Sequence, residues 1–374
     1  MGRRAGPPVA WGERVIEIPL VDLRAQHEQV ADEVADGWAE VLKTTAFING
    51  PQVARFESEF AAYQEVAHAI GVGNGTDAIE LALRALGVGH GDEVVLPANT
   101  FIATAEAVAR AGATPVLVDC VDDTLLIDVD QVSSVVTSRT KAVVPVHLYG
   151  QAAPVELLPH GLPVVEDAAQ AQGARRNGVA VGGLGVAAAT SFYPGKNLGA
   201  YGDGGAVLTT SDAIAESVRL LREHGSPRKY EHPVLGFNSR LDTLQAVVLS
   251  AKLRRLEGWN QARGAAAQRY TELLADVERV RVPVVLDGNL PVWHLYVVRV
   301  PERDRVLSAL HAAGIGAGIH YPTPLHKTGA FAHLDGSFPV AETSAAELLS
   351  LPLFPEITEA QQTRVAEALK EALR

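Results

Sequence analysis

Short apolar runs alternate with helix-like stretches through the middle of this chain, and this alternation limits its fold more than any other feature. The runs have the length of buried strands and lie at residues 93–96, 115–118, 142–146, 162–165, 187–193 and 206–209. Helix-like stretches such as residues 103–110 separate them. Strands that alternate with helices are typical of an α/β fold with a mostly parallel central sheet flanked by helices. The sequence therefore predicts an α/β fold of this kind.

The flanking segments predict further elements. These are an amphipathic helix at residues 53–70, a long helical stretch at 241–277, a strand at 292–300, and helices at 303–313 and 359–373. We therefore expect a large domain at residues 18–257 and a smaller C-terminal α+β domain at residues 258–374.

Composition excludes several classes of partner. The chain has 32 basic and 44 acidic residues and a formal net charge of −12, and its densest basic stretches are only short pairs. Nucleic acids and anionic membranes are therefore not expected partners. We find no apolar run long enough to span a membrane and no export signal, so a cytoplasmic location is expected. The chain has one cysteine, Cys120, and its histidines do not follow the spacing of metal ligands. We therefore expect no metal site.

A glycine-rich segment at residues 71–78 opens one helix-like stretch. Gly75 and Thr76 lie where that helix would begin, and backbone amides at a helix N-terminus bind anions such as phosphate. The segment lacks the third glycine of the dinucleotide-binding fingerprint, and the chain has no Walker pattern. Taken alone, the segment fits either a phosphate site or a tight turn before a capped helix.

Two strand ends carry candidate catalytic groups. Glu166 and Asp167 end one apolar run, and Lys196 follows another. Open α/β sheets bind ligands at the carboxyl ends of their strands, where a buried lysine loses its proton more readily than in water. Each group alone also fits an ordinary surface residue.

One cofactor requires all three features. Pyridoxal 5′-phosphate needs a helix N-terminus for its phosphate, a carboxylate beside its ring nitrogen and a lysine amine for its aldehyde. The combination predicts an enzyme that uses this cofactor.

Several motifs then point to a family. They are Gly73-Asn-Gly-Thr-Asp-Ala78, Pro97-Ala-Asn-Thr-Phe-Ile-Ala-Thr104, Pro145-Val-His-Leu-Tyr-Gly150, Glu166-Asp-Ala-Ala-Gln170, Ser191-Phe-Tyr-Pro-Gly-Lys-Asn197, Gly236-Phe-Asn-Ser-Arg-Leu-Asp242 and Ile319-His-Tyr-Pro322. With them the sequence resembles the DegT/DnrJ/StrS sugar-nucleotide aminotransferases, which are fold-type I enzymes, from about Ile18 onward. Residues 1–17 have no counterpart and are expected to form an N-terminal tail.

The resemblance implies roles for individual residues. Lys196 would bond covalently to the cofactor, and Asp167 would pair with its ring nitrogen. The other implied cofactor residues are Gly75, Thr76 and Ser191 at the phosphate, Gln170 near the ring hydroxyl, Phe101 on the ring face and Asn238 reaching the phosphate from the neighbouring subunit. Lys196 also favours transamination, because the family's dehydratases carry histidine at that position.

The resemblance further implies a homodimer with shared active sites. Arg240, His320 and Tyr321 would lie on the substrate side. The expected amino donor is L-glutamate, and the expected acceptor is a nucleotide-diphosphate-linked keto-deoxysugar, 3-keto and dTDP-linked, of an antibiotic deoxysugar pathway. Arg228 and Lys229, a basic pair beside a family motif, are candidates for binding the diphosphate.

Two alternatives stay open from the sequence. One is a 4-ketosugar or aminocyclitol aminotransferase of the same family. The other is a non-catalytic binding or regulatory protein that keeps the fold without the reaction.

Overall fold

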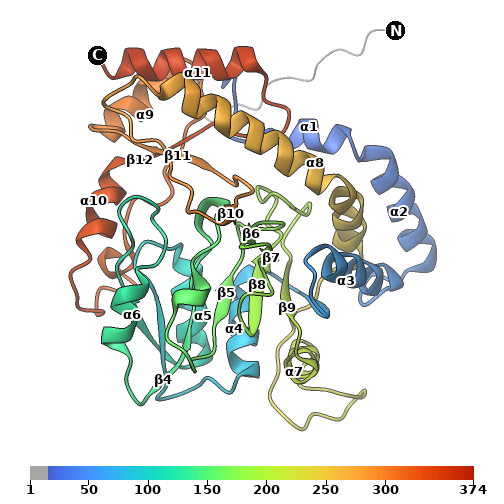
Figure 1. The fold of residues 1–374 in the computed structure, drawn as a ribbon. Coiled ribbons are helices and arrows are strands. Elements are labelled where there is room, and N and C mark those ends of the chain that lie inside the picture. Colours follow the sequence, from blue (N-terminus) through green and yellow to red (C-terminus); the bar gives the residue numbers. More distant parts are fainter. Residues whose placement is uncertain (1–15) are drawn as a thin grey trace.

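The computed structural model describes residues 16–374 and has a mixed sheet at its centre (Figure 1). A three-stranded part, in the order β3-β2-β4, lies beside a four-stranded part, in the order β5-β8-β9-β1. The parallel bridges Val143–Val164 and Val146–Asp167 join the two parts between β4 and β5. The strands are β1 (His68–Val72), β2 (Glu93–Pro97), β3 (Thr114–Val118), β4 (Thr140–Val143), β5 (Val165–Asp167), β8 (Ala187–Ser191) and β9 (Gly205–Thr209).

The strand directions confirm the predicted sheet. The pairs β2–β3, β2–β4 and β5–β8 are parallel. Of the strands in this sheet, β9 alone runs against its neighbours, β8 and β1. The sheet is therefore mostly parallel, and its carboxyl edge collects the residues that follow several strands.

Helices cover both faces of the sheet, and β8 shows why. Successive residues of a strand point to opposite faces. Ala187 and Ala189 pack in the core that contains residues of α4, α5 and α7, whereas Ala188 packs in the core of α3 and α8. The N-terminal and central helices are α1 (Leu23–Glu28), α2 (Ala31–Thr44), α3 (Pro51–Tyr63), α4 (Gly75–Ala85), α5 (Ile102–Ala111), α6 (Val129–Val135), α7 (Asp212–Arg222) and α8 (Thr243–Leu274).

The helix predicted at residues 53–70 is shorter than expected. It ends at Tyr63, and the left-handed backbone of Glu65, with a φ of 56°, turns the chain away from the helix axis. Ile70 belongs instead to β1, where it pairs with Val207 of β9. Its spacing from Phe60 continued the helical period by coincidence.

A smaller α+β part follows along the second half of α8. Its core contains Tyr270 of α8 and Tyr296 of β11, both fully buried. The predicted boundary between residues 257 and 258 lies inside α8, which runs unbroken through it, so the division into two domains stays a prediction. The elements of this part are β11 (Tyr296–Arg299), α9 (Arg303–Ala312), α10 (Pro339–Glu347), β12 (Leu348–Leu351) and α11 (Glu359–Ala372), and a separate small sheet contains β6 (Arg175–Arg176), β7 (Val179–Ala180) and β10 (Asn289–Leu290).

Most of the predicted tail at residues 1–17 lies outside the described residues. The backbone amides of Glu17 and Ile18 donate to the carbonyl of Gly314, at 2.8 and 3.1 Å, so the chain is already packed against the C-terminal part there. Within residues 16–374, no helix has the length and apolarity to cross a membrane. The same residues contain no cluster of three or more histidine, cysteine or acidic side chains that could hold a metal ion.

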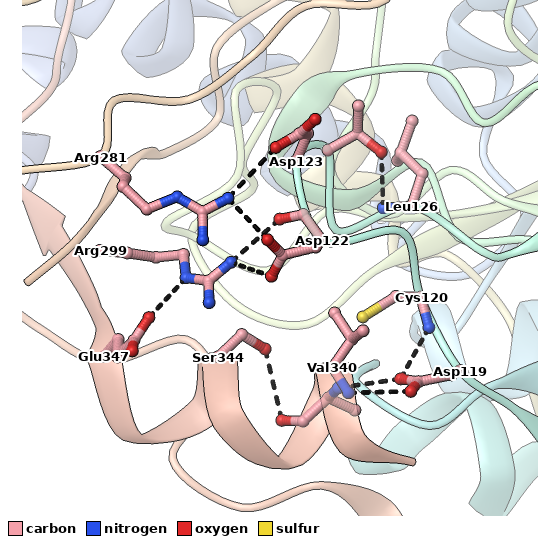
Figure 2. Close-up of polar contacts among 12 residues, drawn as sticks. Asp119, Cys120, Asp122, Asp123, Leu126, Arg281, Arg299, Val340, Ser344 and Glu347 are labelled. Carbon is pink, nitrogen blue, oxygen red and sulfur yellow. Dashed lines mark hydrogen bonds and ion pairs between the residues drawn. The ribbon is translucent and has the colours of Figure 1, made fainter.

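Polar contacts join the segment after β3 to the C-terminal part (Figure 2). The buried carboxylate of Asp119 accepts hydrogen bonds from the amides of Val340 and Ala341, at 2.9 and 2.8 Å, and so caps α10. Ion pairs beside this cap connect Arg281 and Arg299 with Asp122, Asp123 and Glu347. These contacts hold the segment after β3 against the C-terminal part of the chain.

Candidate active site

A cavity of about 710 Å³ opens at the carboxyl ends of β2, β5 and β8. Its walls include the N-terminal turns of α4 and α5 and a segment of the C-terminal part. Most of the predicted site residues line this cavity, namely Gly75, Thr76, Phe101, Asp167, Gln170, Ser191, Lys196, His320 and Tyr321. The fold therefore brings together residues that are far apart in sequence.

The N-terminus of α4 presents free backbone amides to the cavity. The first four N–H groups of a helix have no partner within the helix. Asn74 caps α4 by accepting from the amide of Asp77 at 2.8 Å, while Gly75 and Thr76 have no amide acceptor among the described residues. A Cβ atom at Gly75 would lie 2.6 Å from Cβ of Ser191, so only glycine lets α4 come this close to the end of β8.

The two acids at the end of β5 face different surroundings. Glu166 is fully buried and accepts from Nε2 of His147 at 2.8 Å and from the amide of Gly182 at 2.9 Å. Asp167 lines the cavity instead, and one of its oxygens accepts from the hydroxyl of Thr104 at 2.7 Å. Consecutive strand residues point in opposite directions, so Asp167 is the acid available to a ligand.

Gln170 holds one aromatic residue of the cavity in place. Its side-chain oxygen accepts from the amide of Tyr149 at 2.6 Å, which leaves its NH₂ group to donate to the hydroxyl of Tyr321 at 3.0 Å. The rings of Tyr321 and Phe101 lie 5.1 Å apart, and half of the Phe101 side-chain surface is exposed toward solvent. An unfilled aromatic face of this kind can pack against a planar ligand.

Lys196 enters the cavity from the turn after β8. Its amide donates to the carbonyl of Tyr193 at 2.9 Å, which closes that turn. Burial lowers the pKa of the Lys196 amine from 10.5 to about 8, although the negative charge of Asp167 opposes part of the shift. The amine is therefore far more often neutral, and hence nucleophilic, than that of an exposed lysine.

Two histidines in the cavity are neutral at physiological pH. Burial and the nearby Lys196 lower the pKa of His320 to about 4, and its Nδ1 lies 2.8 Å from the hydroxyl of Ser350. Burial likewise lowers the pKa of His294 well below its usual value. Because Asn197 donates its NH₂ to the carbonyl of Val292, its oxygen faces Nδ1 of His294, at 3.1 Å, and must accept a hydrogen bond from the Nδ1–H group. His294 thus keeps Nε2 unprotonated.

Four predicted residues lie outside the cavity of this chain. Asn238 is exposed, and its side-chain oxygen accepts from Arg240 at 2.7 Å. Arg240 also lies 3.4 Å from the carboxylate of Glu223. Arg228 and Lys229 are exposed in the connection between α7 and α8, which extends beyond α7 in Figure 1. A single chain therefore does not bring these residues to Lys196.

Comparison with known proteins agrees with this geometry. Residues 28–370 match the DegT/DnrJ/EryC1/StrS aminotransferase family. The chain belongs to this family. It is 48% identical over 369 residues to the pleiotropic regulatory protein of Geobacillus stearothermophilus, which covers 96% of this chain and 99% of that protein.

Two further relatives of this aminotransferase are named for their products or substrates. The dTDP-3-amino-3,4,6-trideoxy-alpha-D-glucose transaminase of Streptomyces venezuelae is 46% identical over 362 residues, covering 95% of this chain and 96% of that protein. The UDP-N-acetyl-3-dehydro-alpha-D-glucosamine 3-aminotransferase of Acidithiobacillus ferrooxidans is 45% identical over 362 residues, covering 95% and 98%.

Solved structures agree with the fold of the aminotransferase. DesV of Streptomyces venezuelae, crystallised in complex with a ketimine intermediate, superposes with a TM-score of 0.93 at 46% identity over 96% of this chain and 99% of that one. NtdA of Bacillus subtilis, with bound cofactor PMP, gives 0.88 at 29% identity over 96% and 86%. The protein is a sugar aminotransferase that uses pyridoxal phosphate.

The residues of the aminotransferase cavity fit this cofactor. The free amides of Gly75 and Thr76 suit its phosphate, the carboxylate of Asp167 suits a protonated ring nitrogen, and the amine of Lys196 suits its aldehyde. Sequence reasoning assigned no role to Thr104 or His294. Both act through partners that are distant in sequence, so no local spacing marks them.

Proposed function

We propose that this aminotransferase moves the amino group of L-glutamate to the 3-keto carbon of a dTDP-linked keto-deoxyhexose. The observation that carries the catalytic part of this proposal is the convergence of Lys196, Asp167 and the N-terminus of α4 on one cavity. The substrate part draws on the transaminase of Streptomyces venezuelae, which is named for a dTDP-3-amino sugar.

In this proposal Lys196 is the catalytic base. Pyridoxal phosphate, when bound, supplies an aldehyde that takes up the amino group and a ring that withdraws electrons from the neighbouring C–H bond. In the resting enzyme the amine of Lys196 would hold the cofactor covalently. When free, the same amine would remove the proton from Cα of the amino donor and deliver a proton to the cofactor carbon that is bonded to the transferred nitrogen. Its lowered pKa of about 8 suits both tasks.

The other cavity residues bind and orient the cofactor. Asp167 would accept a hydrogen bond from the ring nitrogen and keep that nitrogen protonated, Phe101 would pack on the ring face, and Gln170 would contact the ring hydroxyl. The amides of Gly75 and Thr76 would bind the phosphate together with the hydroxyl of Ser191. That hydroxyl accepts from the amide of Tyr193 at 3.2 Å, so its proton is free to donate to the phosphate.

We further propose that the active unit is a homodimer in which each chain completes the site of the other. Asn238 would reach the partner's phosphate site, and Arg240 its substrate. Tyr230 and Leu235, on the same connection, leave 83% and 96% of their surface exposed. Large exposed apolar side chains of this kind favour contact with another protein surface.

Substrate binding would use residues of both chains. Neutral His320 and Tyr321 lie within the cavity and can hydrogen-bond the sugar. Arg228 and Lys229 of the neighbouring chain would neutralise the diphosphate of the substrate. Because the chain has a net charge of −12, a diphosphate can bind only where positive side chains offset this charge locally.

A panel of acceptors tests the substrate proposal. The holoenzyme would be incubated with L-glutamate and with dTDP-, UDP- and GDP-linked 3-keto and 4-keto deoxysugars and a keto-cyclitol, and amino products would be detected by mass. We expect product from a dTDP-linked 3-keto sugar. Amination of 4-keto sugars or of the cyclitol, with 3-keto sugars ignored, would establish the alternative instead.

Reduction with borohydride tests the role of Lys196 separately. The cofactor-loaded protein should carry a pyridoxyl group on Lys196 after reduction and peptide mapping. A label on another lysine would contradict the assignment, whatever the substrate is.

The Geobacillus relative is named as a regulatory protein, which raises the non-catalytic alternative again. A protein that had kept only the fold would not need a lysine of lowered pKa beside an acid in one cavity. The purified protein should therefore absorb in the visible range, and this absorbance should shift when L-glutamate is added. Protein that stays colourless with added pyridoxal phosphate would favour the regulatory role.

A further inference from the structure

Thr104 makes the shorter of two hydrogen bonds to the Asp167 carboxylate. It lies in the first turn of α5 and is fully buried. Its hydroxyl donates to Oδ2 of Asp167 at 2.7 Å, whereas Oδ1 accepts from the amide of Ala169 at 3.2 Å. Within residues 16–374, no other group hydrogen-bonds this carboxylate.

The direction of the hydrogen bonds follows from the charge of Asp167. An ionised carboxylate only accepts, so Thr104 must give its single hydroxyl proton to Asp167. The hydroxyl of Thr100 lies 2.8 Å from that of Thr104 and must then donate to it. A one-way chain of hydrogen bonds from Thr100 through Thr104 to Asp167 results, and it fixes the orientation of the carboxylate.

The helix that carries Thr104 also stabilises a negative charge beside its N-terminus. Asp167 meets α5 within its first turn, where the unpaired amides give the helix a partial positive charge that favours an anion. Phe101, the N-cap residue of α5, makes no side-chain capping bond, so no polar side chain at that position competes for these amides.

We propose that Thr104 is a positioning residue that holds the Asp167 carboxylate turned toward the cofactor ring. This inference rests on the proposed role of Asp167 as partner of the ring nitrogen. It adds a residue that acts through its hydrogen bond to the acid.

Replacement of the hydroxyl by a methyl group tests the inference. Thr104→Val should raise the Kd of the apoprotein for pyridoxal phosphate about tenfold, because a hydrogen bond to a charged group is lost. Thr104→Ser should restore the affinity. An unchanged Kd in Thr104→Val would overturn the proposal. Should the valine variant not fold, Thr104→Ala removes the same hydroxyl and takes its place.

A matched threonine separates positioning from stability. Thr209 of β9 is also buried, and its hydroxyl donates to the carbonyl of Val186 at 2.8 Å, outside the cavity. Thr209→Val should lower the thermal midpoint of the apoprotein and leave the cofactor Kd unchanged. If Thr209→Val weakens cofactor binding as much as Thr104→Val does, the effect of Thr104 is a general loss of stability.

A double-mutant cycle separates this inference from the role of Asp167. Asp167→Asn should weaken cofactor binding by itself, and adding Thr104→Val to it should cause little further loss. If Asp167→Asn binds as tightly as the wild type, the proposed role of Asp167 is wrong. If Asp167→Asn weakens binding and Thr104→Val weakens it equally in both backgrounds, the role of Asp167 stands and Thr104 acts independently of it.

Discussion

Glu166 and Asp167 are neighbouring acids with different surroundings. Glu166 is enclosed by His147 and backbone amides, whereas Asp167 meets Thr104 and the cavity. The difference arises from the two-residue period of the strand, because each step along β5 reverses the direction of the side chain. At the scale of single residues, the site is thus defined by where a side chain points.

The lowered pKa of Lys196 predicts a pH profile. At pH 7 an amine of pKa about 8 is neutral roughly 300-fold more often than one of pKa 10.5. The rate at which the apoprotein bonds covalently to added pyridoxal phosphate should therefore rise with pH and level off above about 8. Stopped-flow absorbance measures this rate, and a midpoint near 10.5 would contradict the prediction.

The same shift predicts how apoprotein stability depends on pH. The folded protein binds fewer protons than the unfolded chain between the two pKa values, so its stability should increase as pH rises from about 8 to 10.5. Lys196→Met should remove this part of the pH dependence and stabilise the apoprotein at pH 7. Urea unfolding at several pH values provides the measurement, and identical profiles for the two proteins would contradict it.

The sequence predicted those site residues that could be recognised by their type and by their position after a strand. Lys196 and Asp167 follow strand-like runs, and the α/β pattern places such positions at one edge of the sheet. The sequence pattern alone could not show which of Glu166 and Asp167 faces the ligand, since that depends on the register of β5. Thr104 and His294 were missed because their partners are set by tertiary contacts.

At the scale of elements, the site depends on how closely α4 approaches β8. A Cβ atom at Gly75 would lie 2.6 Å from Cβ and 3.2 Å from Cα of Ser191, so backbone would have to move. The helix and the strand therefore meet at a distance that only glycine permits. The amides at the start of α4 point into the cavity from this junction.

Gly75→Ala should accordingly displace the start of α4 from the cofactor phosphate. We expect the Kd for pyridoxal phosphate to rise about tenfold or more, since overpacking forces backbone shifts. Fluorescence titration gives the Kd. Gly89→Ala is a matched control, because no atom lies within 4 Å of its added Cβ, and it should bind as the wild type does. Equal affinities of all three proteins would show that the junction tolerates a side chain.

Element boundaries were harder to predict than element types. Strand-like runs matched the sheet because their buried, apolar character is local. The helix at residues 53–70 was predicted too long, because hydrophobic spacing does not register the left-handed turn at Glu65. The pairing of Ile70 with Val207 of β9 shows that Ile70 belongs to a strand, and the hydrophobic spacing alone could not show this.

At the scale of the whole molecule, residues of one chain do not complete the proposed site. Arg240 donates to Asn238 and pairs with Glu223, outside the cavity of its own chain. Sequence motifs placed Arg240 and Asn238 in the partner's site only through the resemblance to the family. Oligomeric state lies beyond local sequence patterns, since it depends on the complementarity of surfaces.

Subunit mixing tests the shared site. Lys196→Ala and Arg240→Ala homodimers should each be almost inactive. After subunit exchange, half of the dimers are mixed, and each mixed dimer holds one intact site, so about a quarter of wild-type activity should return. Mass spectrometry of differently tagged subunits verifies the exchange. Verified exchange without recovery would contradict sharing, as would an active monomer.

The cap on α10 should contribute to the free energy of unfolding, because it joins the segment after β3 to the C-terminal part. Asp119→Ala leaves the amides of Val340 and Ala341 without their acceptor and should destabilise the protein by about 1–2 kcal/mol. Urea unfolding measures the loss. Asp123→Ala breaks only an exposed ion pair with Arg281 and should cost less than about 0.5 kcal/mol. Equal effects of the two substitutions would show that the cap is not specific.

The cap also has a consequence for the order of events during synthesis. Asp119 leaves the ribosome 221 residues before its partner amide at Val340. Until then its carboxylate has only the amide of Cys120 within its own segment, and His320 lacks the hydroxyl of Ser350 that orients its ring. A nascent chain can thus form much of the sheet and present Lys196 while one wall of the cavity is still missing. We therefore expect newly made protein to bind its cofactor after translation has ended, so that pyridoxal phosphate in the cell binds completed chains.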